Sequence, residues 1–132
     1  MLLVDWPSRD VPDTLARAGF RVFAQEGPER YVAYELSGGE VHPRAVAGPP
    51  ESVDLVYAYR PLDELPDVVA LARSLRATAI WVQSGRDAGG AKDLQGCWLS
   101  PDEIQRARRI VGDAGLAFIS EPYIADVARA SR

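Results

Sequence analysis

Residues 53–59 read Val-Asp-Leu-Val-Tyr-Ala-Tyr, and this run is the strongest strand signal in the chain. It is short and rich in β-branched and aromatic residues, as expected of a strand buried inside a sheet. Residues 62–76 follow with apolar side chains at helical spacing, and residues 79–83 form another apolar run. Strand, helix and strand in this order predict a parallel βαβ unit.

The same alternation continues toward both ends of the chain. Further strands are predicted at residues 2–4, 20–24 and 116–120, and further helices at residues 10–18, 100–114 and 123–130. Asp10 is the predicted N-cap of the first of these helices, and Gly19 is predicted to end it in a left-handed conformation. Ser100 and Glu103 have the spacing of a capping box, which predicts the start of the second.

A hairpin interrupts the alternation between residues 31 and 46. Two strand-like runs, residues 31–36 and 41–46, flank the turn sequence Ser-Gly-Gly-Glu at 37–40, and Pro43 predicts that the returning strand lies at a sheet edge. The predicted fold is therefore a Rossmann-like α/β domain. It has a mostly parallel sheet, helices on both faces and an added β-hairpin, and it spans residues 1–132 as a single domain.

Composition narrows the class of protein. The chain has 132 residues, 47% of them hydrophobic, and a formal net charge of -4, which argues against a broad nucleic-acid surface. We find no apolar stretch of 18 residues, so we expect no membrane association. Cys97 is the single cysteine, which fits a reducing compartment, and we expect a cytoplasmic protein.

Candidate ligand-binding residues follow from the predicted sheet, because open parallel sheets bind ligands beyond the carboxyl ends of their strands. Polar and aromatic residues gather at four strand exits. They are Asp5, Trp6, Ser8 and Arg9 after the first strand, Gln25 after the second, Tyr59 and Arg60 after the central strand, and Gln83, Ser84 and Gly85 after the next.

Three segments carry a resemblance to a known family. Residues 53–61 resemble the central strand and exit arginine of the CoA-binding family, and residues 79–85 resemble its next strand with a tryptophan, a glutamine and a glycine. Residues 18–22 are similar to the end of its first helix and its second strand. The resemblance implies a Rossmann-like fold and a small-molecule ligand, CoA or a related nucleotide.

The chain departs from that family in three places. The family usually has a glycine directly after the first strand, where Asp5 stands here, and an Asn-Pro after the second strand, where residues 25–28 read Gln-Glu-Gly-Pro. The long segment 84–100, rich in glycine, resembles an insertion and predicts a lid. Asp5 places a negative charge where phosphates would lie, while Ser8 and Arg9 are available to a phosphate just ahead of a helix.

Several candidate residues have two readings. Trp6 either stacks on an adenine or fills the top of the sheet. Arg60 either pairs with a phosphate or forms a salt bridge with Asp63 or Glu64. Gln83 either bonds the ligand or a loop backbone.

Catalytic chemistry finds little support in the sequence. His42 is the single histidine and lies in the hairpin, far in the chain from Cys97, and no metal-ligand spacing occurs, so we expect no metal site. The leading hypothesis is a non-catalytic CoA- or nucleotide-binding domain. The alternative is an interaction or regulatory protein that keeps the fold without the ligand. An enzyme using Asp5 or Cys97 is the weakest of the three hypotheses.

Overall fold

The computed structural model describes residues 1–83 and 99–131. Ser84, Gly85 and the rest of the predicted lid up to residue 98 lie outside this described part. Within it the elements alternate along the chain as β1 (Leu2–Val4), α1 (Asp10–Arg17), β2 (Val22–Gly27), β3 (Arg30–Ser37), β4 (Glu40–Val46), β5 (Leu55–Ala58), a 3-10 turn (Leu62–Glu64), α2 (Leu65–Ser74), β6 (Ala79–Val82), α3 (Pro101–Asp113), β7 (Ala117–Ile119) and α4 (Ile124–Ala130).

The described strands form one mostly parallel sheet in the order β4-β3-β2-β1-β5-β6-β7. Strand β1 pairs in parallel with both β2 and β5, while β3 and β4 are antiparallel and extend the sheet beyond β2. Without that hairpin the order is that of a doubly wound sheet whose first strand lies between the second and third. The Rossmann-like fold with an added hairpin is therefore confirmed.

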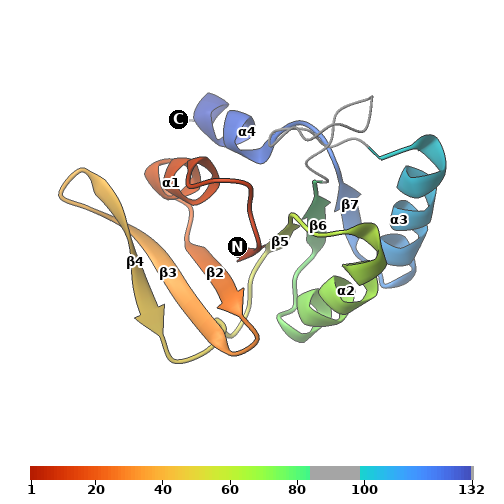
Figure 1. Cartoon of the computed structure of the whole chain (residues 1–132), viewed down its shortest axis with the longest axis horizontal. Helices are drawn as coiled ribbons and strands as arrows, with labels where there is room; N and C mark the ends of the chain where they lie inside the picture. Colours follow the sequence, from red (N-terminus) through yellow and green to blue (C-terminus); the bar gives the residue numbers. More distant parts are fainter. Residues whose placement is uncertain (84–98, 132) are drawn as a thin grey trace.

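The two faces of the sheet carry separate helix pairs (Figure 1). Helices α1 and α4 pack together on one face, over a core that contains Leu3, Leu15 and Tyr57. Helices α2 and α3 cover β5, β6 and β7 on the other face, over a core that contains Leu2 and Ile80. The apolar runs of the parallel strands are thus buried on both sides, as their continuous hydrophobic sequence predicts.

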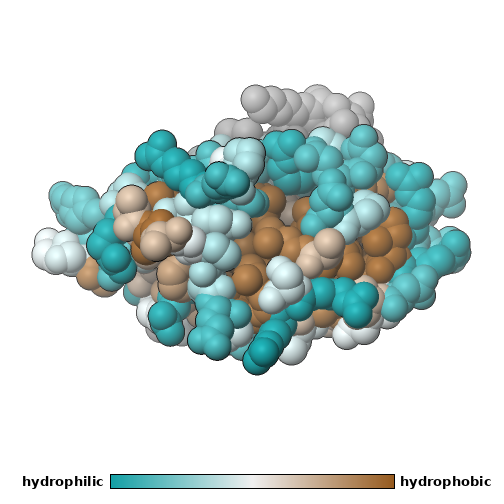
Figure 2. Space-filling view, turned by 90° about the horizontal axis from the view of Figure 1, so that it is seen from below, coloured by the Kyte–Doolittle hydropathy of each residue, from teal (hydrophilic) through white to brown (hydrophobic). Residues whose placement is uncertain are grey.

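The hairpin side of the sheet is covered less completely. Helix α1 packs on β2, β3 and β4, whereas α2 and α3 pack on the strands beyond β1. On the α2 side the partly buried Phe23 and Val46 lie at the margin of the core. Seen from below, apolar side chains reach the surface in the middle of the molecule, between hydrophilic flanks (Figure 2). Pro43 lies on the edge strand β4, where a missing backbone N–H is tolerated.

Local signals placed most helix ends correctly. The capping box of Ser100 and Glu103 is present, and Gly19 and Gly115 both adopt positive φ, at 94° and 79°, directly after helix ends. The assignment of Asp10 as an N-cap is wrong. Arg9 holds the N-cap position without a side-chain cap, and Asp10 is the first residue of α1.

Asp10 instead joins the first helix to the last. Its carboxylate accepts hydrogen bonds from the Tyr123 hydroxyl at 2.9 Å, the Arg129 guanidinium at 2.9 Å and the Thr14 hydroxyl at 3.1 Å. Burial raises the pKa of Asp10, but these hydrogen bonds outweigh it and hold the pKa below its ordinary value. Burial and the bond to Asp10 raise the pKa of Tyr123 to about 12. Asp10 therefore links the start of α1 to the α4 region, at a position where the sequence indicates an N-cap.

Replacing Tyr123 by phenylalanine is expected to destabilise the protein by about 1 kcal/mol at neutral pH, since one hydrogen bond to a carboxylate is lost. The folded-state pKa of Tyr123 is raised, so its contribution is present below pH 10 and is lost as the pH rises toward 12. That of Asp10 is lowered, so its contribution is present above pH 3.8 and is lost on further acidification. Urea denaturation across pH 2 to 12 measures both limbs.

Asp10→Asn serves as the partner variant in this experiment. It removes the acid limb, and it also weakens the alkaline limb because Tyr123 no longer faces a carboxylate. A Tyr123→Phe protein with the same alkaline loss of stability as the wild type would contradict the assignment.

Candidate functional site

The crevice of a doubly wound sheet lies where two neighbouring strands lead to helices on opposite faces. In this chain those strands are β1, which leads to α1, and β5, which leads to α2. Val4 and Ala58 are paired in register, and the N–H of Tyr59 donates to the carbonyl of Val4 at 3.2 Å. The exits of both strands therefore lie at the same level.

A pocket of about 720 Å³ opens at these exits. This volume lies within the usual range for small-molecule sites. It is lined by Val4, Asp5, Trp6, Gln25, Glu26, Gly27, Pro28, Arg60 and Glu64.

Asp5 has an unusual backbone conformation at the floor of this pocket. Its φ is 63°, in the left-handed region that strains most residues other than glycine. One carboxylate oxygen accepts the N–H of Trp6 at 2.8 Å, and the other accepts Nη1 of Arg60 at 3.1 Å. The position where the family resemblance implies a glycine thus keeps a glycine-like backbone, with a side chain that bonds back onto it.

Arg60 lies between two carboxylates. Its Nη2 donates to both oxygens of Glu64, at 2.9 and 2.8 Å, in addition to the bond to Asp5. Hydrogen bonds to Glu64 and then to Asp5 raise the pKa of Arg60, whose side chain remains 40% exposed. Of the two salt-bridge partners considered from the sequence, Glu64 is the one used. Asp5 is a further partner that sequence spacing did not indicate.

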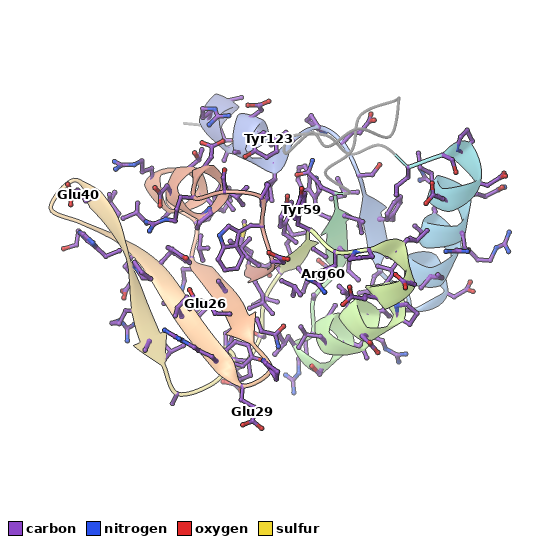
Figure 3. All side chains as sticks on the ribbon, in the orientation of Figure 1. Glu26, Glu29, Glu40, Tyr59, Arg60 and Tyr123 are labelled. Atoms are coloured by element: carbon purple, nitrogen blue, oxygen red, sulfur yellow. The ribbon has the colours of Figure 1, made fainter. Side chains whose placement is uncertain are left out.

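Another part of the pocket wall comes from the segment after β1 and from the end of β2. Trp6 meets Tyr34 edge to face, with ring centroids 6.1 Å apart, so one side of the indole packs on the hairpin while the residue lines the pocket. The amide nitrogen of Gln25 donates to the Tyr31 hydroxyl at 3.3 Å. Glu26 follows on β2, across from Arg60 (Figure 3). The pocket therefore joins an aromatic wall to polar groups.

The described lining of the pocket carries a net negative charge. Among the described lining residues, Asp5, Glu26 and Glu64 contribute three carboxylates against the one guanidinium of Arg60. Arg30 pairs with Glu26 at 3.4 Å, but its side chain is largely exposed, so the pair is weakened by solvent. As long as Arg60 stays paired with Asp5 and Glu64, these carboxylates would repel an anionic ligand.

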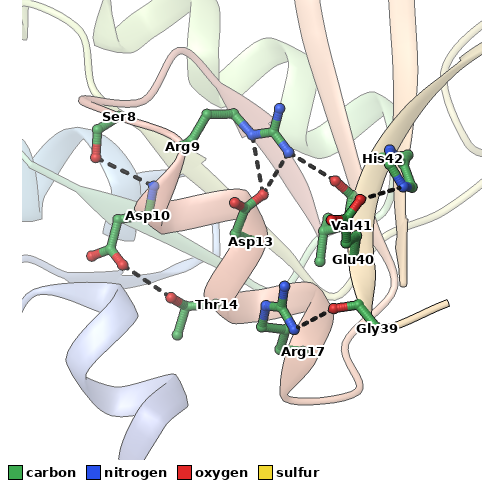
Figure 4. A network of polar contacts seen from close by, with 10 residues as sticks. All are labelled: Ser8, Arg9, Asp10, Asp13, Thr14, Arg17, Gly39, Glu40, Val41 and His42. Atoms are coloured by element: carbon green, nitrogen blue, oxygen red, sulfur yellow. Dashed lines mark hydrogen bonds and ion pairs between the residues drawn. The ribbon is translucent and has the colours of Figure 1, made fainter. Parts of the chain in front are cut away.

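Ser8 and Arg9 face a different part of the molecule. Arg9 donates to Asp13 at 2.7 Å and to the carbonyl of Val41 at 2.9 Å, which ties α1 to β4 (Figure 4). Its guanidinium also lies 5.2 Å from the centre of the Tyr34 ring. The Ser8 hydroxyl accepts the N–H of Asp10 at 3.3 Å. Neither residue is among those lining the pocket.

Two other predicted site residues also lie outside the pocket lining. Gln83 is 1% exposed, and its side-chain oxygen accepts the Tyr57 hydroxyl at 2.8 Å. Tyr59 is half-buried and packs against the α1 and α4 core. The structure therefore brings together Asp5, Trp6, Gln25 and Arg60 out of the ten predicted residues, of which Ser84 and Gly85 lie outside the described part.

Three further lining residues, Glu26, Gly27 and Glu64, are not among the ten predicted site residues, although Glu26 and Gly27 belong to the exit of the second predicted strand. Glu26 and Gly27 belong to the end of β2, which runs three residues beyond the predicted strand. Glu64 had a detectable signal, since it follows Arg60 by four residues, but the spacing indicated a surface salt bridge rather than a pocket wall. Glu64 reaches the pocket wall at the end of the 3-10 turn Leu62–Glu64.

Residues 1–83 and 99–131 offer no candidate metal site. No group of three or more His, Cys, Asp or Glu side chains there is arranged to hold a metal ion. In the same part of the chain, no helix has both the length and the apolar character needed to cross a membrane.

Comparison with known proteins identifies the family of the chain. Searches of curated proteins and of solved structures gave no match. The family model described as CoA binding domain matches residues 4–125, which includes every described element from the end of β1 to the start of α4. This chain belongs to the CoA binding domain family.

Proposed function

We propose that this chain is a non-catalytic domain that binds CoA or a related nucleotide at the carboxyl ends of β1, β2 and β5. The observation that carries the proposal is the pocket of about 720 Å³ at the switch point of a CoA binding domain. In doubly wound sheets this is the usual position for a nucleotide ligand.

The pocket residues suit distinct parts of such a ligand. Trp6 offers an aromatic wall to a base, and Gln25 offers an amide for hydrogen bonding. Arg60 is the cation in the lining and the natural partner of a phosphate, because guanidinium forms paired, charge-assisted hydrogen bonds with oxyanions.

One observation favours the alternative, an interaction or regulatory protein without this ligand. Arg60 is already engaged by Glu64 and Asp5, so a ligand must displace an existing partner. In either case we propose one domain over residues 1–132 and a cytoplasmic location, the latter supported by the single cysteine.

Addition of CoA is expected to raise the melting temperature of the purified protein. A ligand at one hundred times its dissociation constant stabilises the folded state by about 2.7 kcal/mol, which for a domain of this length corresponds to roughly 5 to 15 °C. Scanning calorimetry with CoA, ADP and ATP measures the shift, and isothermal titration gives the affinity. No shift with any of the three at millimolar concentration would favour the interaction protein.

An arginine variant outside the pocket serves as the control for this binding measurement. Arg106 lies exposed on α3, away from the pocket lining. Arg106→Ala is expected to bind CoA as the wild type does. A large loss of affinity in that variant would place the ligand elsewhere.

A further inference from the structure

We propose that Asp5 determines the ligand specificity of this pocket: its carboxylate occupies the position of a ligand anion and lowers the affinity for phosphate-bearing ligands. The inference rests on the proposed function and deepens it. Asp5 is thereby an internal competitor of the ligand rather than one of the groups that bind it.

The contacts of the Asp5 carboxylate are those that a bound oxyanion would make. It accepts a backbone N–H, that of Trp6, and a guanidinium N–H, that of Arg60, at 2.8 and 3.1 Å. Backbone amides in tight turns and arginine side chains are the usual donors of anion sites in proteins. Here both donors point to one place at the switch point, and a side chain of the same chain fills it.

The backbone supports the same conclusion. Asp5 adopts a φ of 63° directly after β1, where a glycine would incur no steric penalty. A glycine here would keep the turn and leave the N–H of Trp6 and the Nη1 of Arg60 open to the pocket. The aspartate side chain therefore fills a site that a glycine in the same turn would leave open.

The negative charge of Asp5 opposes phosphate binding in addition to the position that its carboxylate fills. With Asp5 ionised, the described lining carries three carboxylates and one guanidinium, and the guanidinium is shared between two of those carboxylates. The Arg60–Asp5 pair is exposed, at 40% and 47% of the two side chains. Exposed pairs are weak and exchange readily, so a phosphate can displace Asp5, at a reduced affinity.

The test is titration calorimetry of CoA, and separately of inorganic pyrophosphate, into the full chain and its variants. Asp5→Gly is expected to bind both at least about tenfold more tightly than the wild type, since it frees two donors and removes a negative charge. Asp63→Asn is the matched control. It removes an exposed carboxylate three residues from Arg60 that does not line the pocket, and its affinity is expected to equal that of the wild type.

Two further variants separate occupancy from simple repulsion. In the Asp5→Gly background, Arg60→Ala is expected to remove most of the gain, whereas in the wild type, where Arg60 is already paired, it changes the affinity less. Asp5→Asn keeps the side chain while removing its charge, and is expected to give a smaller gain than Asp5→Gly. A full gain in Asp5→Asn that survives Arg60→Ala would overturn occupancy as the cause.

Each remaining outcome decides a separate question. Wild type that binds CoA, with a folded Asp5→Gly variant that binds no better, overturns the role of Asp5 and leaves the proposed function standing. Binding by Asp5→Gly alone supports the role of Asp5 and overturns CoA binding by the natural chain. Absence of binding in both refutes the two together. Circular dichroism verifies that each variant is folded.

Discussion

Leu2→Ala is expected to destabilise the protein by about 2 to 5 kcal/mol, the range for truncating a fully buried leucine. Leu2 is 0% exposed in β1 and lies between Phe23 of β2 and Val56 of β5 in the sheet register. The loss combines the transfer free energy of the removed atoms with the cavity that the two neighbouring strands prevent from closing. For a domain of this length it lowers the melting temperature by roughly 6 to 25 °C.

Leu36→Ala is the matched control for this substitution. Leu36 is also a leucine on a strand, β3, but it is 49% exposed, and its truncation is expected to change the stability by less than about 0.5 kcal/mol. Urea denaturation with circular dichroism measures both variants. Equal effects of the two substitutions would contradict the placement of β1 at the centre of the sheet.

Tyr57→Phe is expected to destabilise the protein by about 1 to 3 kcal/mol. The Tyr57 hydroxyl donates to the side-chain oxygen of Gln83, and the two residues are 0% and 1% exposed. Removing the hydroxyl leaves a buried amide oxygen without this donor, and solvent has little access to replace it. The effect is therefore larger than that of Tyr123→Phe, where the carboxylate partner keeps two other donors.

The double variant Tyr57→Phe with Gln83→Met isolates the pair. Methionine has a shape close to that of glutamine without the amide, so replacing both partners removes the unsatisfied group, and part of the lost stability is expected to return. A double variant that loses the sum of the two single losses would show that the hydrogen bond is not what couples them.

Periodicity in the sequence was sufficient for the order of elements. The apolar runs at residues 2–4, 53–59 and 79–83 contain the strands β1, β5 and β6, and the Gly-Gly turn with Pro43 predicted an edge hairpin. These features depend on side chains close together in the chain. Strand ends were less accurate, because β2 continues to Gly27 through pairing with β3, a contact that no local pattern encodes.

The candidate site was predictable only in part for the same reason. The rule that ligands meet the carboxyl ends of parallel strands selected Asp5, Trp6, Gln25 and Arg60, and the structure places these four around one pocket. It also selected Arg9, which packs on Tyr34 and β4, because nothing in the chain order tells which side of the first turn its side chain will take.

The sequence by itself determined the α/β alternation, the parallel sheet with its hairpin, and the set of strand exits where a ligand belongs. Only the tertiary structure decided which exit residues face one another. Asp5 and Arg60 are 55 positions apart and meet because β1 and β5 are neighbours in the sheet. Strand pairing brings these two side chains together, and local propensity carries no information about which strands become neighbours.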